Sequence, residues 1–409
     1  MEKLAIHGGK KVKTTPFGTG KRFGKEELIQ LEEAINQNTL FYWLGNKVKE
    51  MNKKFADLYG VPYCVATSSG TAALHTALGA CGITAGDEVI TSPITDMGSI
   101  IGIIYQNAIP IFADVDPHTY NITAETIEKC ISEKTKAIMV VHLAGNPCDM
   151  DPIMELAKKH DIIVLEDAAH AFGAMYKGKK VGTIGDFAAF SFHEVKNITS
   201  FGEGGIVHTN VPEMKPQMSR ARFLGLDFSK KIKHWLYDIS PINGKYGPAV
   251  ATNSSTTEIQ GLGLTLQIAR NDKILAERRA AAKYLTERFA ENDAIIPQDI
   301  GNDDIKPSFH LYLLEIDPAK AGGDIQVLKK KLEEKGVTQI PHFGPLYRFD
   351  ILRKLGGYDE EAIAATCPNC EEVFYNRFTH LPIYGLSEEQ LIYMADAVLE
   401  SVKEMQEGR

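Results

Sequence analysis

The sequence predicts an α/β protein built on a large, mostly parallel sheet, with a smaller α+β domain at its C-terminal end. Three observations lead to this expectation. Short β-branched runs alternate with helical patterns between residues 62 and 209, as in repeated strand–helix–strand units. The early runs are continuously apolar, which is typical of strands buried on both faces. The chain's 409 residues also exceed what one hydrophobic core usually organises.

Seven runs carry the strand pattern, at residues 63–67, 88–91, 110–113, 137–142, 162–165, 187–192 and 205–208. The rhythm stops between residues 222 and 253, which marks either a domain boundary or a functional loop. A long helical pattern over residues 258–292 then leads into the second unit. We therefore expect a large domain at residues 1–255, including an N-terminal arm, and a small domain at residues 256–409.

The charge balance excludes several classes of partner. The formal net charge is −8, from 45 Lys and Arg against 53 Asp and Glu. No basic surplus is available for nucleic acid or an anionic membrane. The loop lysines Lys230, Lys231 and Lys233 are expected to be solvated, the alternative being a site for a substrate phosphate or nucleotide.

Targeting segments and metal sites are not expected. The first residues, MEKLAIHGGKKVKTTPF, develop no signal-peptide core, so we expect a cytoplasmic protein. The most apolar stretch, at residues 100–112, is interrupted by Gln106, Asn107 and Pro110 and is too short for a membrane span. Of six cysteines only Cys367 and Cys370 are closely spaced, so reduced loop thiols are favoured over a zinc site.

A possible phosphate site follows the first predicted strand. Ser69, Gly70 and Thr71 come directly after this strand and open an alanine-rich helical pattern. The free N–H groups and positive dipole end of a helix N-terminus bind phosphate, and nearby hydroxyls assist. The alternative is that Ser69 only caps the helix.

Two further residues suit cofactor chemistry. Asp167 ends a predicted strand at the edge where an α/β sheet binds ligands, and its carboxylate could pair with a protonated ring nitrogen. The alternative is a helix cap. Lys196 lies 29 residues later in a turn-rich segment before a glycine loop, where its amine could form a Schiff base. A lone lysine is usually a surface residue. The occurrence of all three features in this order favours the catalytic interpretation.

Seven segments together carry a resemblance to a known family. They read SSGTAALHTAL, GDEVITSP, IPIFADVDPHTYNI, TKAIMVVHLAGNPCDMD, VLEDAAHAFGA, GDFAAFSFHEVKNIT and GEGG. These segments resemble the DegT/StrS family of sugar aminotransferases that use pyridoxal 5′-phosphate. The similarity runs from about Tyr42 to the C-terminus and is densest up to Asn210. The opening LAIHGGKKVKTTPF and the segment GVPYCV are most similar to the branch acting on keto-cyclitols, including scyllo-inosose, and on the aminohydroxybenzoate precursor.

The resemblance implies a fold-type I enzyme and a role for each matching residue. Lys196 would form the internal aldimine and shuttle the proton, while Asp167 would keep the pyridine nitrogen protonated. His170 would lie beside the ring hydroxyl, unless it is simply a histidine at a helix start. The family's phosphate cup is matched by Gly70, Thr71 and Ser191, next to Ser69.

Other matches concern the partner subunit and the substrate. Asn253 matches an asparagine that reaches the phosphate from the partner subunit, which implies a homodimer with shared active sites. His342 matches a histidine near the sugar, the alternative being an ordinary loop residue. Asp96 departs from the family, which has an aromatic stacked on the cofactor there, and Ser254 stands where Tyr is frequent. Asp96 is either a helix N-cap or a carboxylate that binds a hydroxyl or ammonium group of the acceptor.

Taken together, these features predict an aminotransferase that moves an amino group from glutamate or glutamine to a keto-sugar or keto-cyclitol. One alternative is a sugar dehydrase of the same family, in which histidine replaces the Schiff-base lysine. The presence of Lys196 disfavours it. Another is a non-catalytic regulator that binds pyridoxal phosphate, which the intact pair of Lys196 and Asp167 disfavours.

Overall fold

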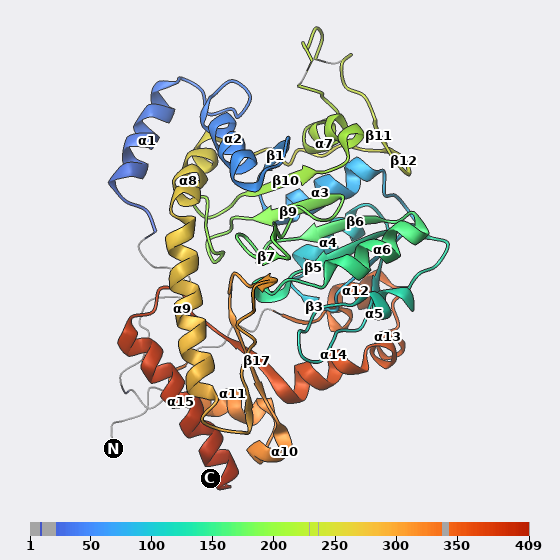
Figure 1. Cartoon of the computed structure of the whole chain (residues 1–409). Helices are drawn as coiled ribbons and strands as arrows, with labels where there is room; N and C mark the ends of the chain where they lie inside the picture. Colours follow the sequence, from blue (N-terminus) through green and yellow to red (C-terminus); the bar gives the residue numbers. More distant parts are fainter. Residues whose placement is uncertain (1–8, 10–21, 229, 236, 338–342, 409) are drawn as a thin grey trace.

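A seven-stranded sheet forms the centre of the larger domain in the computed structural model, which describes residue 9 and residues 22–228, 230–235, 237–337 and 343–408 (Figure 1). The strands in order across the sheet are β1 (Cys64–Thr67), β10 (Gly205–Thr209), β9 (Phe187–Ser191), β6 (Ile163–Asp167), β5 (Thr135–Val141), β2 (Glu88–Thr91) and β4 (Ile109–Phe112). Strand β10 pairs antiparallel with β1 and β9, and every other pairing is parallel. The predicted mostly parallel sheet is confirmed.

Helices and the N-terminal segments pack around this sheet. They are α1 (Lys25–Asn36), α2 (Lys47–Tyr59), α3 (Gly70–Cys81), α4 (Gly98–Tyr105), α5 (Ala124–Glu128), α6 (Met150–His160), α7 (Lys215–Arg222) and α8 (Glu258–Ala269). Every residue of β6, β9 and β10 is buried, which explains why these strands read as continuous apolar runs. In the described part of the chain, no helix combines the length and apolar character needed to cross a membrane.

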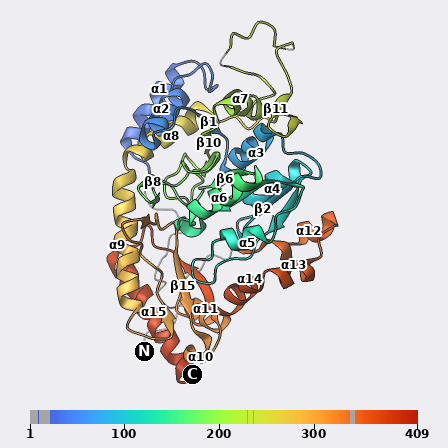
Figure 2. The same cartoon turned by 45° about the vertical axis from the view of Figure 1, so that its right-hand side comes forward.

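The smaller domain has an antiparallel sheet and its own buried core. Its strands, β13 (Ile295–Ile296), β15 (Tyr312–Ile316) and β17 (Phe378–Leu381), pair in that order. The helices around it are α9 (Asn271–Phe289), α10 (Pro318–Ala321), α11 (Ile325–Glu334) and α15 (Glu388–Gln406). Helix α9 runs from the large domain down to this core, where α15 lies beside it (Figures 1 and 2). The expected α+β character of the smaller domain is confirmed.

The remaining elements are short. They are β3 (Ile94–Thr95) paired with β16 (Gly344–Pro345), β7 (Met175–Tyr176) between β8 (Lys179–Lys180) and β14 (Ile305–Lys306), the hairpin of β11 (Ile242–Gly244) and β12 (Gly247–Ala249), and the helices α12 (Asp350–Leu355), α13 (Glu360–Thr366) and α14 (Pro368–Glu372). Residues 343–378 return to the larger domain, because Phe343, Tyr347 and Cys370 belong to the core cluster around the large sheet.

Two expectations need correction. The helical pattern over residues 258–292 forms two helices, α8 and α9, because Arg270 departs from helical geometry between them. Its guanidinium pairs there with Glu26 and Glu27. The stretch 222–253 is a loop of the larger domain, not a boundary, because Phe223 and Ile242 are buried in the large core.

Candidate active site

Strand register brings the predicted phosphate and ring segments to one edge of the large sheet. Thr67 at the end of β1 lies opposite Gly205, and Gly205 lies opposite Ser191 at the end of β9. Asp167 at the end of β6 lies opposite Ala189 of β9. Because the carboxyl ends of β1, β6 and β9 meet at this edge, residues far apart in sequence, such as Thr67 and Gly205, become neighbours.

The N-terminus of α3 begins at this edge. Ser69 is its N-cap, with Oγ accepting a hydrogen bond of 3.1 Å from the N–H of Ala72. Ser69 therefore caps α3. A Cβ on Gly70 would lie 2.5 Å from Cβ of Ser191, so only glycine lets the helix start approach the end of β9 so closely. The dipole end of α3 and the hydroxyl of Ser191 thus lie close together.

Asp167 is buried and held by two hydrogen bonds. Its Oδ2 accepts 2.7 Å from Oγ of Ser99, and its Oδ1 accepts 3.1 Å from the N–H of Ala169. Burial raises the pKa of Asp167, and these hydrogen bonds offset part of that increase. Residues 168–174, which directly follow Asp167, form turns and not a helix. The helix-cap alternative for Asp167 is therefore wrong.

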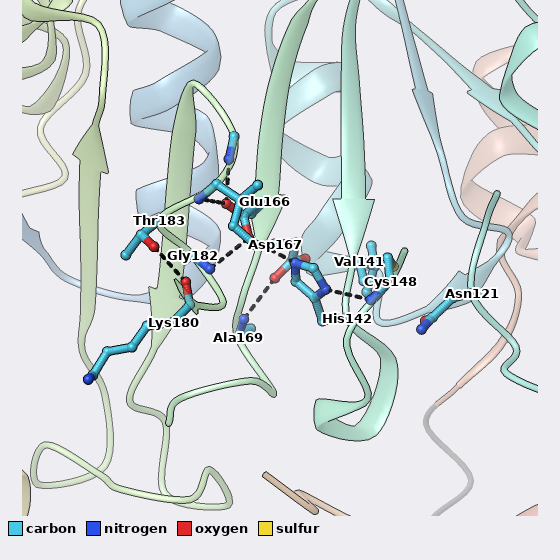
Figure 3. A network of polar contacts seen from close by, with 12 residues as sticks. Asn121, Val141, His142, Cys148, Glu166, Asp167, Ala169, Lys180, Gly182 and Thr183 are labelled. Atoms are coloured by element: carbon cyan, nitrogen blue, oxygen red, sulfur yellow. Dashed lines mark hydrogen bonds and ion pairs between the residues drawn. The ribbon is translucent and has the colours of Figure 1, made fainter. Parts of the chain in front are cut away.

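A second carboxylate fixes the strand end on which Asp167 stands (Figure 3). Glu166 is fully buried and accepts hydrogen bonds of 2.6–2.7 Å from the backbone N–H groups of Gly182, Ile184 and Gly185. His142 contacts it through Nε2 at 3.1 Å, and Nδ1 of His142 accepts from the N–H of Cys148. Burial alone would raise the pKa of Glu166, but His142 and the backbone donors outweigh it and lower the pKa.

Lys196 lies in the loop that leaves β9, partly buried. Burial lowers the pKa of its amine, while the charges of Asp96, Asp167 and Glu203 raise it. The amine therefore shares an environment with Asp167, unlike a solvated surface lysine. Its backbone is fixed as well, since its carbonyl accepts 2.7 Å from Nη1 of Arg22.

His170 is buried in a turn, so the helix-start alternative is wrong. Its ring stacks on His310 with centroids 4.5 Å apart. His310 also contacts Oδ1 of Asn197 through Nδ1 at 3.3 Å, and Nδ2 of Asn197 donates to the carbonyl of Ser308. The segment that enters β15 therefore contacts both His170 and the residue after Lys196.

The other predicted site residues lie in different places. Asp96 is exposed and its Oδ1 accepts 2.8 Å from the N–H of Gly98, the first residue of α4. The N-cap of α4 is Met97, so the expectation that Asp96 is itself the N-cap is wrong. Asn253 is exposed, with Oδ1 accepting from Ser255. His342 lies outside the described residues. The loop lysines 230, 231 and 233 are exposed.

The cysteine pair lies in the core of the larger domain. Cys367 and Cys370 are buried free thiols at the start of α14, and burial raises the pKa of Cys367 to about 12. The described residues form no cluster of three His, Cys, Asp or Glu side chains that could hold a metal ion.

Sequence reasoning did not single out Ser99, Glu166, His142 or Arg22. Ser99 stands 68 positions before its partner Asp167, and Arg22 stands 174 positions before Lys196. The available signal was a serine in the segment after Asp96, at the start of an apolar helix. Nothing in that local pattern identifies its partner.

Comparison with known proteins gives a consistent result. The profile of the DegT/DnrJ/EryC1/StrS aminotransferase family matches residues 21–399. GDP-perosamine synthase of Caulobacter vibrioides is 37% identical over 312 residues, covering 74% of this chain and 78% of the relative. A putative L-glutamine:3-amino-2,3-dideoxy-scyllo-inosose aminotransferase of Streptoalloteichus tenebrarius is 33% identical, covering 84% and 82%. A putative sugar aminotransferase from Streptococcus pneumoniae, solved in its PLP form, superposes with a TM-score of 0.83 at 26% identity, covering 96% and 100%.

Fold and comparisons define a fold-type I aminotransferase that depends on pyridoxal phosphate. The chain belongs to the DegT/DnrJ/EryC1/StrS aminotransferase family, whose members here include sugar aminotransferases.

The residues at the sheet edge suit this cofactor. A helix N-terminus that closely approaches a serine hydroxyl suits a phosphate dianion. A buried carboxyl whose pKa is raised gains a counter-charge from a protonated ring nitrogen. An amine of lowered pKa suits an aldehyde, because only the neutral amine is nucleophilic.

Proposed function

We propose that this aminotransferase takes an amino group from glutamate or glutamine and transfers it to a keto-sugar or keto-cyclitol. The observation that carries the proposal is the environment of Lys196, a partly buried amine whose pKa is lowered by burial and which senses the charge of Asp167. The names of the relatives support the acceptor class, since one is a GDP-perosamine synthase and another a putative scyllo-inosose aminotransferase.

The proposed roles follow from the chemistry of each residue. When bound, pyridoxal phosphate supplies an electron sink for the carbon that carries the amino group. Lys196 would hold the cofactor through its amine and would move the proton at the substrate carbon. Asp167, oriented by Ser99, would keep a proton on the ring nitrogen. His170 would lie beside the ring hydroxyl.

The phosphate would be held at the start of α3. Ser69, Gly70 and Thr71 offer N–H groups and hydroxyls there, and Ser191 adds a hydroxyl from β9. His342 and Asp96 are the proposed contacts to the acceptor.

We also propose a homodimer in which Asn253 reaches the phosphate of the partner's site. An aromatic patch supports this assembly: Trp43 packs on Phe228 at 4.5 Å, and Trp235 packs on Phe223 and Phe228. Trp43 and Trp235 are 37% and 45% exposed. Phe223 is bridged to Asn253, so Asn253 lies next to these aromatic residues. Clustered exposed aromatics of this kind mark protein interfaces.

The direct test measures each half-reaction separately. The PLP-loaded protein is mixed with L-glutamate or L-glutamine at single-turnover concentrations, and release of the 2-oxo acid is followed together with the visible absorbance of the cofactor. We expect about one 2-oxo acid per Lys196. A panel of keto-sugars and keto-cyclitols, including scyllo-inosose, is then tested for recovery of the original absorbance.

Lys196→Ala serves as the variant and Lys230→Ala as its exposed control. We expect Lys196→Ala to fold but release no 2-oxo acid, and Lys230→Ala to match the wild type. Wild-type turnover in Lys196→Ala would refute the mechanism. A wild-type protein that binds the cofactor but reacts with no amino donor would indicate a regulator instead.

A further inference from the structure

Two arginines are buried against one tyrosine near the Lys196 loop. Arg22 is 7% exposed and Arg278, on α9, is 1% exposed. Their guanidinium carbons lie 4.8 and 4.3 Å from the ring centroid of Tyr384. We call this group the arginine–tyrosine sandwich. Tyr384 itself is partly exposed.

The sandwich holds two positive charges without a paired carboxylate. Across the described residues, neither guanidinium has an Asp or Glu oxygen within 4.0 Å. Their hydrogen bonds go to backbone carbonyls: Arg22 donates to Lys196 at 2.7 Å, and Arg278 donates to Phe309 and His310 at 3.0 Å. Nε and Nη2 of Arg22 and Nε of Arg278 make no hydrogen bond. Donor capacity and charge both remain unused.

This arrangement is costly for the protein alone. Burying an unpaired charge is unfavourable, and two like charges side by side add repulsion. Burial lowers the pKa of Arg278 to about 9, and the charge of Arg22 contributes to that decrease. Several other arginines are paired with carboxylates, such as Arg288, which contacts Glu291 and Asp396. Arg222 is also buried without a carboxylate, but it stands alone against Tyr42.

The position of the sandwich indicates what would supply the missing charge. Arg22 is hydrogen-bonded to the backbone of Lys196, the residue whose amine would react with the donor. In an α-amino acid, the carbon that bears the amino group also bears a carboxylate. A donor whose amino group reacts at Lys196 therefore brings a carboxylate close by, whereas a keto-sugar or keto-cyclitol brings none at that carbon. Guanidinium groups bind carboxylates well, and most strongly in buried sites.

We propose that Arg22 and Arg278 form a carboxylate subsite, which binds the carboxylate of the amino-acid donor next to Lys196. This inference rests on the proposed function, from which it takes the donor class. It assigns the selection of the donor to the sandwich, and so separates donor recognition from acceptor recognition at one active site.

The first test uses unreactive probes and needs no turnover. Glutarate has two carboxylates and no amino group, and glutaramide is its neutral counterpart. A ligand that binds only the folded protein raises its melting temperature. We expect glutarate, but not glutaramide, to raise the melting temperature of the PLP-loaded wild type. Equal effects of the two compounds would overturn the proposal without any variant.

The second test compares variants of Arg22. We expect Arg22→Gln to weaken glutarate binding at least tenfold, and Arg22→Lys, which keeps the charge, to weaken it less. Arg288→Gln, also on α9, is the matched control and should bind glutarate like the wild type. Unchanged affinity in Arg22→Gln would overturn the subsite.

A final readout distinguishes this proposal from the proposed function. In Arg22→Gln, release of 2-oxo acid from glutamate should slow at least tenfold at low donor concentration, while reaction with scyllo-inosamine, an amine without a carboxylate, should change less than twofold. If both slow equally, the subsite is wrong. If wild type binds glutarate through Arg22 but accepts no amino group from glutamate, the proposed function fails and the subsite stands.

Discussion

At the scale of single residues, Asp96 has a structural role and also acts on the charge of the Lys196 amine. Its Oδ1 accepts a hydrogen bond from the N–H of Gly98 at the start of α4, and its charge is the largest of those that raise the pKa of Lys196. This hydrogen bond uses one carboxylate oxygen. Because the residue is exposed, the other oxygen is available to a ligand.

Two substitutions separate these roles. Asp96→Asn keeps an oxygen that can accept the hydrogen bond from Gly98 and removes the charge, whereas Asp96→Ala removes both the hydrogen bond and the charge. We expect Asp96→Ala to lose ~1 kcal/mol of stability and Asp96→Asn to lose less. Both should still release 2-oxo acid from the donor but aminate the keto acceptor at least tenfold more slowly. Thermal melts and the two half-reactions measure this, and an unchanged acceptor half-reaction would leave Asp96 as a cap only.

The same pair of variants makes a pH prediction. Since Asp96 raises the pKa of Lys196, removing its charge should lower that pKa further. The neutral amine then persists to lower pH. The measurement is the rate at which the apoprotein takes up pyridoxal phosphate at a series of pH values. In Asp96→Asn this rate should stay at its maximum down to a lower pH than in the wild type.

At the scale of elements, the start of α4 is tied to the end of β6. Ser99 on α4 donates 2.7 Å to Asp167 and also contacts Oγ1 of Thr95 at 2.9 Å. Glu166, the residue before Asp167, collects three backbone N–H groups of the 182–185 turn. The strand end is thus held from two sides, which orients the Asp167 carboxylate before any ligand binds.

Ser99→Ala tests this connection. Burial already places the folded-state pKa of Asp167 above its unfolded value, and loss of the Ser99 hydrogen bond should raise it further. A carboxyl group whose pKa is higher in the folded protein than in the unfolded protein destabilises the fold when it ionises. The free energy of unfolding therefore decreases as pH increases through its titration. We expect Ser99→Ala to lose ~1–3 kcal/mol at pH 7 and much less near pH 4.

Thermal melts of the apoprotein at both pH values provide the measurement. Ser92→Ala is the matched control, because Ser92 is equally buried but hydrogen-bonds the backbone of Ile94 and no carboxylate. Its destabilisation should not depend on pH. If the two serine variants have the same pH dependence, Ser99 does not act through Asp167.

At the scale of the whole molecule, the site draws on both domains. The segment 308–310 of the chain enters β15 of the small sheet and contacts Asn197 and the turn at His170. Helix α9 carries Arg278 to the same place, where its guanidinium binds the carbonyls of residues 309 and 310. Movement between the domains would therefore displace groups on two sides of Lys196.

The proposed homodimer gives a test by mixing. Lys196→Ala and Asn253→Ala should each be inactive or strongly impaired alone. In a mixed dimer one site receives both defects and the other receives neither. Mixing equal amounts under exchange conditions should restore about a quarter of wild-type activity. Sedimentation velocity checks the dimer, and absence of any recovery in confirmed mixed dimers would contradict shared sites.

The sequence by itself determined the sheet and the order of the chemical groups. Strands at residues 63–67, 162–165 and 187–192 were predicted because burial on both faces leaves a local, continuous apolar pattern. Asp167 and Lys196 were predicted from their placement after such strands. These are properties of neighbouring residues, which a linear sequence displays directly.

Only the tertiary structure decided which groups hold those residues in place. Ser99 orients Asp167 across 68 positions, Arg22 contacts Lys196 across 174, and Arg278 joins Arg22 around Tyr384. Arg270, at the break between α8 and α9, pairs with Glu26 and Glu27 of a helix distant in sequence. Such contacts follow from how strands and helices pack, and packing depends on the whole chain, so no local pattern of residues reveals them.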